Sequence, residues 1–85
     1  MRHVAGGRDQ VPIAVRSIAA DALAFAAQGV VIAHNHPSGD VTPSARDVAF
    51  TRALAAGLRT VDVVLFDHVV IAGERVASLR AMGVV

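Results

Sequence analysis

The feature that most constrains the fold is a short strand followed by a turn and a helix start. Residues 30–33 are Val-Val-Ile-Ala, an apolar and mostly β-branched run that follows Gly29. Such a run, closed by the turn signal Pro37-Ser38-Gly39, is typical of a buried strand. A helix is expected to begin after Pro43, with Ser44 at its N-cap and an acid, Asp47, three residues later. This succession of strand, turn and helix indicates an α/β protein.

Two histidines and one aspartate lie at the junction between the predicted strand and helix. His34 and His36 are two residues apart at the strand end, so their side chains point to the same face. Side chains in the first helical turn lean back toward the N-terminus, which brings Asp47 toward the histidines. Two imidazole nitrogens and one carboxylate oxygen form the ligand set of a catalytic zinc site, with a fourth position for water. The spacing predicts that His34, His36 and Asp47 bind Zn²⁺.

A simpler interpretation of the same residues needs no metal. Ser44 and Asp47 alone make an ordinary capping box, in which each side chain hydrogen-bonds the other residue's backbone. The joint occurrence of a histidine pair, a Pro/Gly turn and a first-turn acid favours metal binding. For Ser44 the two interpretations are compatible, because its hydroxyl can cap the helix or polarise a bound carbonyl oxygen.

The rest of the chain predicts further strands and a second helix. Residues 15–28 have a wide apolar stripe that includes Ile18, Ala22 and Phe25, and Gly29 is expected to cap this helix. The helix after Ser44 is expected to end at or near Gly57. The remaining elements are strands over residues 2–5, 30–34 and 60–66, and a hairpin of residues 69–72 and 75–77. A mixed sheet flanked by helices, in one domain of residues 1–85, accommodates this order.

The pair Asp67-His68, between two of these predicted strands, leaves two interpretations open. It orients a metal ligand from outside the ligand set, or it is a loop pair that hydrogen-bonds the backbone.

Composition excludes several classes of protein. The chain is 54% hydrophobic with a mean hydropathy of +0.54, yet no uncharged apolar run reaches the ~18 residues of a membrane span. The net charge of +1 is too small to indicate a nucleic-acid surface. The absence of cysteine excludes disulfides, cysteine-ligated zinc and a thiol nucleophile, and fits a cytoplasmic protein.

The pattern His34-x-His36, seven residues, Ser44-x-x-Asp47 is the core of the JAMM motif of JAB/MPN metalloproteases. The string HNHPSGDVTPSARDVAFTRAL closely resembles bacterial RadC-like proteins, once named DNA repair proteins, and the resemblance continues through VVLFDHVVIAGERVASLRAMGVV. It implies a three-layer, cytidine-deaminase-like arrangement. It also implies zinc held by the two histidines and Asp47, with Ser44 assisting at the developing oxyanion.

The sequence departs from this family at the general base. The resemblance implies a glutamate on a strand upstream of the histidines, which takes a proton from the attacking water. The single glutamate here is Glu74, far downstream, and the upstream acids Asp9 and Asp21 are no obvious replacement. The chain is therefore expected to be an N-terminally incomplete JAB/MPN domain. It should bind zinc but hydrolyse amide, peptide or isopeptide bonds weakly or not at all, since acid–base help is typically worth ~10²–10⁴ in rate.

Three classes of function follow. The first is a zinc metallohydrolase acting on a peptide or protein substrate, completed by a glutamate from elsewhere. The second is a zinc-binding interaction module without catalysis, and the third is a DNA-associated repair factor, suggested by the family name alone. A truncated sheet exposes an edge strand, and exposed edges tend to pair. A homodimer or an exchanged strand is therefore expected.

Overall fold

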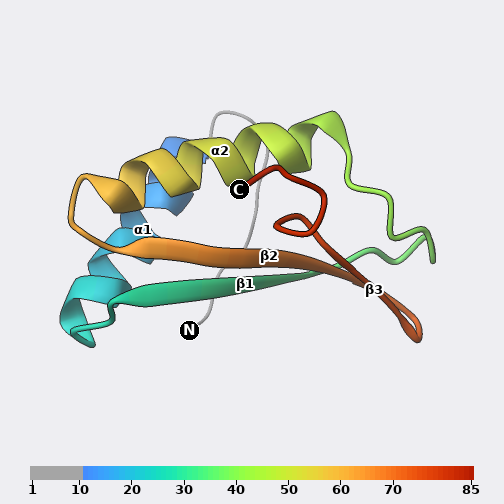
Figure 1. Ribbon diagram of the computed structural model, residues 1–85, viewed down its shortest axis with the longest axis horizontal. Coiled ribbons are helices and arrows are strands. Elements are labelled where there is room, and N and C mark those ends of the chain that lie inside the picture. Colours follow the sequence, from blue (N-terminus) through green and yellow to red (C-terminus); the bar gives the residue numbers. More distant parts are fainter. Residues whose placement is uncertain (1–10) are drawn as a thin grey trace.

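The computed structural model describes residues 11–85, which form two helices and a three-stranded sheet (Figure 1). The strand predicted over residues 2–5, and Asp9, lie outside the described residues. The elements in chain order are α1 (Val11–Ala24), β1 (Gly29–Asn35), α2 (Ala45–Arg59), β2 (Val64–Ala72) and β3 (Arg75–Ser78).

The sheet is mixed, as predicted. Its strand order is β1-β2-β3, with β1 parallel to β2 and β2 antiparallel to β3. Parallel neighbours need a crossover, and α2 supplies it along the sheet (Figure 1). The α/β class is therefore confirmed. In residues 11–85 both helices contribute to one apolar core on one face of the sheet, and the buried residues of this core are Ile18, Ala22, Val30, Ile32, Phe50, Leu54, Leu58, Val63 and Leu65.

Helix α1 ends earlier than the predicted boundary at Gln28. Ala26 adopts a left-handed φ of 53°, and the N–H of Ala27 donates to the carbonyl of Ala22 at 2.8 Å. These features define a Schellman cap, and Gly29 is instead the first residue of β1. Phe25, predicted within the apolar stripe, lies beyond the helix with 77% of its surface exposed.

The cap at Ala26 predicts an unusual gain of stability. A left-handed conformation costs a residue with a Cβ atom about 1–2 kcal/mol, part of which the greater chain entropy of glycine offsets. Ala26→Gly should therefore raise the free energy of unfolding by about 0.5–1 kcal/mol, measured by urea denaturation. Ala53→Gly, the same change at an exposed position inside α2, should lower it by about 1 kcal/mol. Losses of equal size in both variants would contradict the proposed strain at Ala26.

Gly57 lies near the end of α2, as predicted, but it is not the cap of the helix. The helix continues to Arg59 and its C-cap is Thr60. A Cβ atom added at Gly57 would lie 2.6 Å from Cγ1 of Val15, which belongs to α1. The glycine therefore permits close packing of the two helices. This contact between two helices is a further role of Gly57, which the local sequence does not indicate.

Strand β2 is continuous where two separate strands were predicted. It contains Asp67 and His68, which are therefore not loop residues. The register with β1 shifts between Val30, which pairs with Leu65, and Val31, which pairs with Asp67. Phe66 is the extra residue of this β-bulge. Before the bulge Leu65 faces the helices, and after it His68 does so, because the extra residue inverts the alternation.

The sheet face opposite the helices is exposed in the described residues. Val31, Val64, Phe66 and Val76 each have more than half of their surface accessible to solvent. Strand β1 is also an edge, since β2 is its single partner among residues 11–85. Neither described helix has the length and apolar character that crossing a membrane requires.

Candidate metal centre

The predicted ligands His34, His36 and Asp47 converge from the end of β1 and the start of α2. One ligand atom from each of the three residues lies within 4.8 Å of the other two. The Nε2 atom of His36 is 3.1 Å from Oδ2 of Asp47, and the Nδ1 atom of His34 is 3.4 Å from Oδ1. The two imidazole rings meet edge to face, with centroids 4.7 Å apart.

These separations fit a tetrahedral metal ion. Ligand atoms placed 2.0–2.1 Å from zinc at tetrahedral angles are about 3.3 Å apart. The observed 3.1 and 3.4 Å are close to that value, and they reach the two different oxygens of the Asp47 carboxylate. Asp47 is buried, whereas both histidines are partly exposed. The group can therefore hold a metal ion and remain accessible from solvent.

The hydrogen bonds of His36 also suit a metal. Its Nδ1 lies 2.9 Å from the backbone carbonyl oxygen of Asp40, which can only accept, so Nδ1 carries a proton. In the neutral ring Nε2 then presents a lone pair to the carboxylate of Asp47 at 3.1 Å. Two acceptors facing each other need a cation or a proton between them. A metal ion held by both atoms meets this need, as does a second proton on the ring.

Asp47 is prepared as an anionic ligand by the start of α2. The N–H of Ser44 donates to Oδ2 of Asp47 at 2.8 Å, and the N–H of Asp47 donates to the Ser44 hydroxyl at 3.0 Å. Burial raises the pKa of Asp47, but its hydrogen bonds with Ser44 and the adjacent His34 and His36 outweigh burial and keep the pKa below 3.8. The carboxylate is therefore ionised at neutral pH.

Ser44 occupies the N-cap as predicted, and both halves of the capping box are present. The structure therefore contains both the capping box and the cluster of candidate ligands, and Asp47 belongs to both. The hydroxyl oxygen of Ser44 accepts from the backbone of Asp47, and its own proton is left to donate. A role of Ser44 at an oxyanion stays a prediction.

Glu74 offers no replacement for the general base. It lies exposed in the turn between β2 and β3. Asp21 lies within α1, as predicted. Among residues 11–85, no acidic side chain other than that of Asp47 joins the metal-ligand group.

Asp67 and His68 have separate roles, which neither sequence interpretation anticipated in full. Asp67 accepts from the N–H of His68 at 2.7 Å, from the Ser78 hydroxyl at 2.6 Å and from the N–H of Arg80 at 3.0 Å. It therefore ties β2 to the turn that follows β3. His68 points the other way, into the interior, where its Nδ1 lies 2.6 Å from the hydroxyl of Thr51. Thr51 was missed, although it lies four residues after Asp47 on the same helix face.

The Asp67 interactions predict pH-dependent stability. Burial raises the pKa of Asp67, but hydrogen bonds from Ser78, Arg80 and His68 outweigh it and leave the pKa below 3.8. Because the folded protein favours the ionised form, this contribution is complete above the unfolded pKa and is lost as pH falls through the folded pKa. Asp67→Asn should lower the free energy of unfolding by about 1–2 kcal/mol at pH 7 and by less below pH ~4.

Urea denaturation at a series of pH values measures this difference. Asp62→Asn is the matched control, because Asp62 lies exposed in the turn after α2 with a φ of 60°, which asparagine tolerates. A difference between wild type and Asp67→Asn that does not shrink on acidification would contradict the proposed role of the carboxylate.

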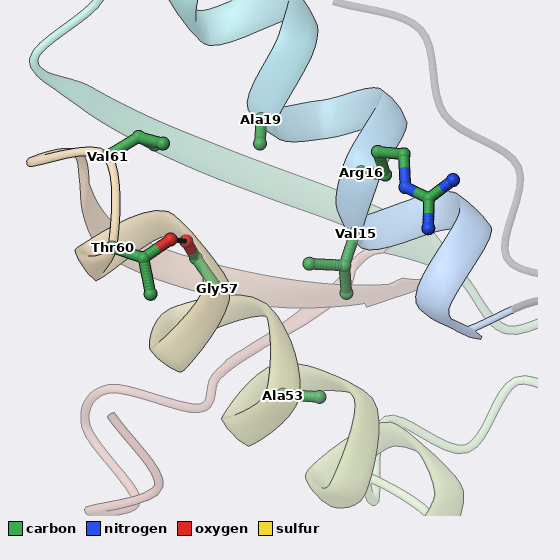
Figure 2. Close-up of a pocket in the computed structure, with 7 residues that line it drawn as sticks. All are labelled: Val15, Arg16, Ala19, Ala53, Gly57, Thr60 and Val61. Carbon is green, nitrogen blue, oxygen red and sulfur yellow. Dashed lines mark hydrogen bonds between the residues drawn. The ribbon is translucent and has the colours of Figure 1, made fainter.

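A hollow between α1 and α2 is separate from the metal-ligand group. Figure 2 shows Val15 of α1 directed toward α2, on which Ala53 and Gly57 lie. The hollow is lined by Val15, Arg16, Ala19, Ala53, Gly57, Thr60 and Val61. None of the three candidate ligands is among them.

Comparison with known proteins agrees with the JAMM pattern and the geometry. The RadC-like JAB domain family matches residues 2–84, which is nearly the whole chain. The chain belongs to the RadC-like JAB domain family. The resemblance noted in the sequence is therefore confirmed.

Curated relatives in this family carry the name UPF0758 protein. One from Cupriavidus pinatubonensis is 46% identical over 78 residues, which are 92% of this chain and 34% of the relative. Another from Bordetella parapertussis is 42% identical over 92% of this chain and 35% of the relative. One from Neisseria meningitidis serogroup B is 44% identical over 84% of this chain and 32% of the relative. The chain thus spans about a third of the length of these RadC-like relatives.

Proposed function

We propose that this RadC-like JAB domain is the zinc-binding part of a metallohydrolase that cleaves amide, peptide or isopeptide bonds. The observation that carries the proposal is the convergence of His34, His36 and Asp47 within 4.8 Å, on the JAMM spacing. Zinc held by three protein ligands lowers the pKa of a water molecule in its fourth position to ~7 and polarises a carbonyl group.

The residues of the chain have distinct tasks in this proposal. His36 is oriented by its bond to the Asp40 carbonyl, and Asp47 is fixed and kept ionised by the capping box with Ser44. The Ser44 hydroxyl proton is the group available to stabilise a developing oxyanion. The general base comes from outside residues 11–85, either from another part of a longer protein or from a partner. Alone, the chain should therefore hydrolyse slowly.

Chemical rescue tests this proposal. A quenched fluorescent peptide and an isopeptide are incubated with the zinc-loaded chain, with and without added acetate, which supplies a carboxylate base. We expect a slow zinc-dependent rate that rises with acetate concentration in wild type and disappears in His36→Ala. Asn35→Ala is the matched control, since Asn35 is exposed between the two histidines. Fast zinc-dependent hydrolysis without acetate would show that the chain needs no outside base, and no zinc-dependent hydrolysis under any condition would contradict the proposed activity.

A non-catalytic zinc-binding interaction module is the second candidate. This candidate is favoured because no glutamate among residues 11–85 lies near the metal-ligand group to act as a general base. The single glutamate there, Glu74, is exposed in the hairpin turn. In this case zinc serves as a clip between β1 and α2. Chelation that unfolds the chain, together with no hydrolysis even with acetate, would favour this candidate. DNA association rests on a former family name alone, and salt-dependent binding to DNA would be its signature.

We also propose that two copies of the chain associate through the uncovered part of the sheet. Edge strand β1 and the exposed side chains of Val31, Val64 and Phe66 support this proposal, because unpaired edges and apolar faces both favour association. Size-exclusion chromatography with light scattering should give a dimer mass for wild type. Val31→Lys should shift the mass toward a monomer, and a monomeric wild type at working concentrations would overturn the proposal.

We also propose the three-layer, cytidine-deaminase-like arrangement that the family resemblance implies. A three-layer, cytidine-deaminase-like arrangement needs a further layer on the exposed sheet face, opposite α1 and α2. The cytoplasmic location predicted from the absence of cysteine is likewise a proposal.

A further inference from the structure

Behind the metal-ligand group lies a buried polar pair, Thr51 and His68. Thr51 is fully buried on α2, and His68 is 2% exposed on β2. Their side chains meet across 17 residues of sequence, with 2.6 Å between the Thr51 hydroxyl oxygen and Nδ1 of His68. A buried polar contact between two elements fixes their relative position, because neither group can turn to water without leaving the other unpaired.

The hydrogen bonds determine which nitrogen of His68 carries the proton. The Thr51 hydroxyl donates its single hydrogen to the backbone carbonyl of Asp47 at 2.6 Å. It can therefore only accept from His68, so Nδ1 is the protonated nitrogen. Nε2 then holds a lone pair, and it has no hydrogen-bond partner in the described part of the chain. Burial lowers the pKa of His68, which agrees with a neutral ring.

This pair contacts two of the three candidate metal ligands from different sides. Thr51 holds the backbone of Asp47 in the first turn of α2. The ring of His68 stacks beside the ring of His34, with centroids 6.0 Å apart and an angle of 27° between the planes. The β-bulge at Phe66 makes this possible, because it turns His68 rather than Asp67 toward the helices. His68 itself is not among the ligand atoms that lie within 4.8 Å of one another.

We propose that His68 and Thr51 are positioning residues of the metal centre. The chain from His68 Nδ1–H to the Thr51 hydroxyl and on to the Asp47 carbonyl fixes the start of α2 against β2. The ring contact between His68 and His34 places this point beside the end of β1. The proposal rests on the proposed metal centre and adds two residues that bind no metal themselves. Groups that orient metal ligands in this way typically contribute 10–100-fold to metal affinity.

A competing account makes the pair ordinary polar core residues, with a Thr51 hydroxyl bonded to the carbonyl one turn earlier, as in many helices. That account predicts that substitutions change the stability of the fold but not the affinity for metal or its coordination geometry. Thr51→Val, which keeps the shape and removes the hydroxyl, separates the two. We expect it to weaken Zn²⁺ binding about 10–100-fold in competition with a chromogenic chelator. Thr51→Ser, which keeps the hydroxyl, should stay within about threefold of wild type.

Thr60→Val is the matched control. The Thr60 hydroxyl also donates to a carbonyl of α2, that of Gly57 at 2.7 Å, but it lies exposed at the opposite end of the helix. The control should bind Zn²⁺ as wild type does. Circular dichroism of the metal-free proteins establishes that each variant is folded.

A second pair of variants tests His68 if Thr51→Val does not fold. Asparagine places an amide N–H near the position of Nδ1, whereas glutamine reaches the position of Nε2 and loses the bond to Thr51. His68→Asn should therefore retain Zn²⁺ binding better than His68→Gln by about tenfold. The visible absorption of the Co²⁺-loaded proteins provides a readout of coordination geometry, which should change in His68→Gln and Thr51→Val but not in Thr60→Val.

The outcomes separate this inference from the proposed function. If wild type binds Zn²⁺ and the folded Thr51→Val and His68→Gln variants bind it equally well with the same Co²⁺ spectrum, the positioning role is overturned and the metal centre stands. If wild type binds neither metal, the metal centre fails and the positioning role fails with it.

Discussion

Asp47→Asn is expected to abolish stoichiometric zinc binding while leaving the chain folded. Wild type purified without added metal should carry about one zinc ion per chain, as a single three-ligand site requires. The Asp47 carboxylate contributes the negative charge of the site and contacts both histidines, at 3.1 and 3.4 Å. Loss of a direct ligand should weaken binding by more than the 10–100-fold that follows from loss of an outer partner, so by more than about 100-fold.

The amide isolates the metal role of Asp47 from its capping role. Asparagine keeps an oxygen that accepts from the N–H of Ser44, and the reciprocal bond to the Ser44 hydroxyl comes from the backbone of residue 47. Helix α2 should therefore keep its cap. Metal content measured by mass spectrometry, with Asp62→Asn as the control, checks the prediction. Equal zinc in wild type and Asp47→Asn would show that these three residues are not the metal centre.

Leu54→Ala should destabilise the chain more than any surface change. Leu54 is fully buried in the core between the helices and the sheet. Removing a buried leucine side chain typically costs about 2–5 kcal/mol, from lost burial and the cavity left behind. Small domains are stable by only about 5–15 kcal/mol, and chains of this size bury a smaller share of their surface on folding than larger domains do. The variant should therefore lose a large part of its stability, with a urea midpoint lower by about 1–3 M.

Leu23→Ala is the matched control for this loss. Leu23 belongs to α1 but is 57% exposed, so the same substitution should change the free energy of unfolding by less than about 0.5 kcal/mol. Both variants are measured in excess chelator, so that metal binding does not contribute to the difference. Similar urea midpoints for the two variants would contradict the packing of α2 against the sheet.

The candidate ligands could be predicted because their arrangement depends on neighbouring residues in the sequence. His34 and His36 share a face through the two-residue period of a strand, and the capping box fixes Asp47 at the start of α2. His36 and Asp47 are eleven residues apart, and the chain between them makes the turn that Pro37-Ser38-Gly39 predicts. Strand periodicity, the turn signal and the capping box were therefore sufficient to predict that these three residues lie close together.

The local sequence indicated the wrong end for α1 and did not indicate the helix contact made at Gly57. Gly57 lies near the end of α2, as predicted, and Val15 of α1 occupies the space that a Cβ atom at this position would need. Ala26 takes the left-handed position at the end of α1, although a nearby glycine is the better candidate by propensity. The hydrophobic periodicity of a single helix indicates neither the contact at Gly57 nor the left-handed residue at Ala26.

By itself, the sequence determined the α/β class, the family and the three residues that converge at the end of β1. Only the tertiary structure decided what lies behind them. The bulge at Phe66 exists because β2 is paired with β1, and it turns His68 inward to meet Thr51. A single extra residue in one strand inverts every side chain that follows, and this inversion depends on the register between two strands rather than on either sequence alone.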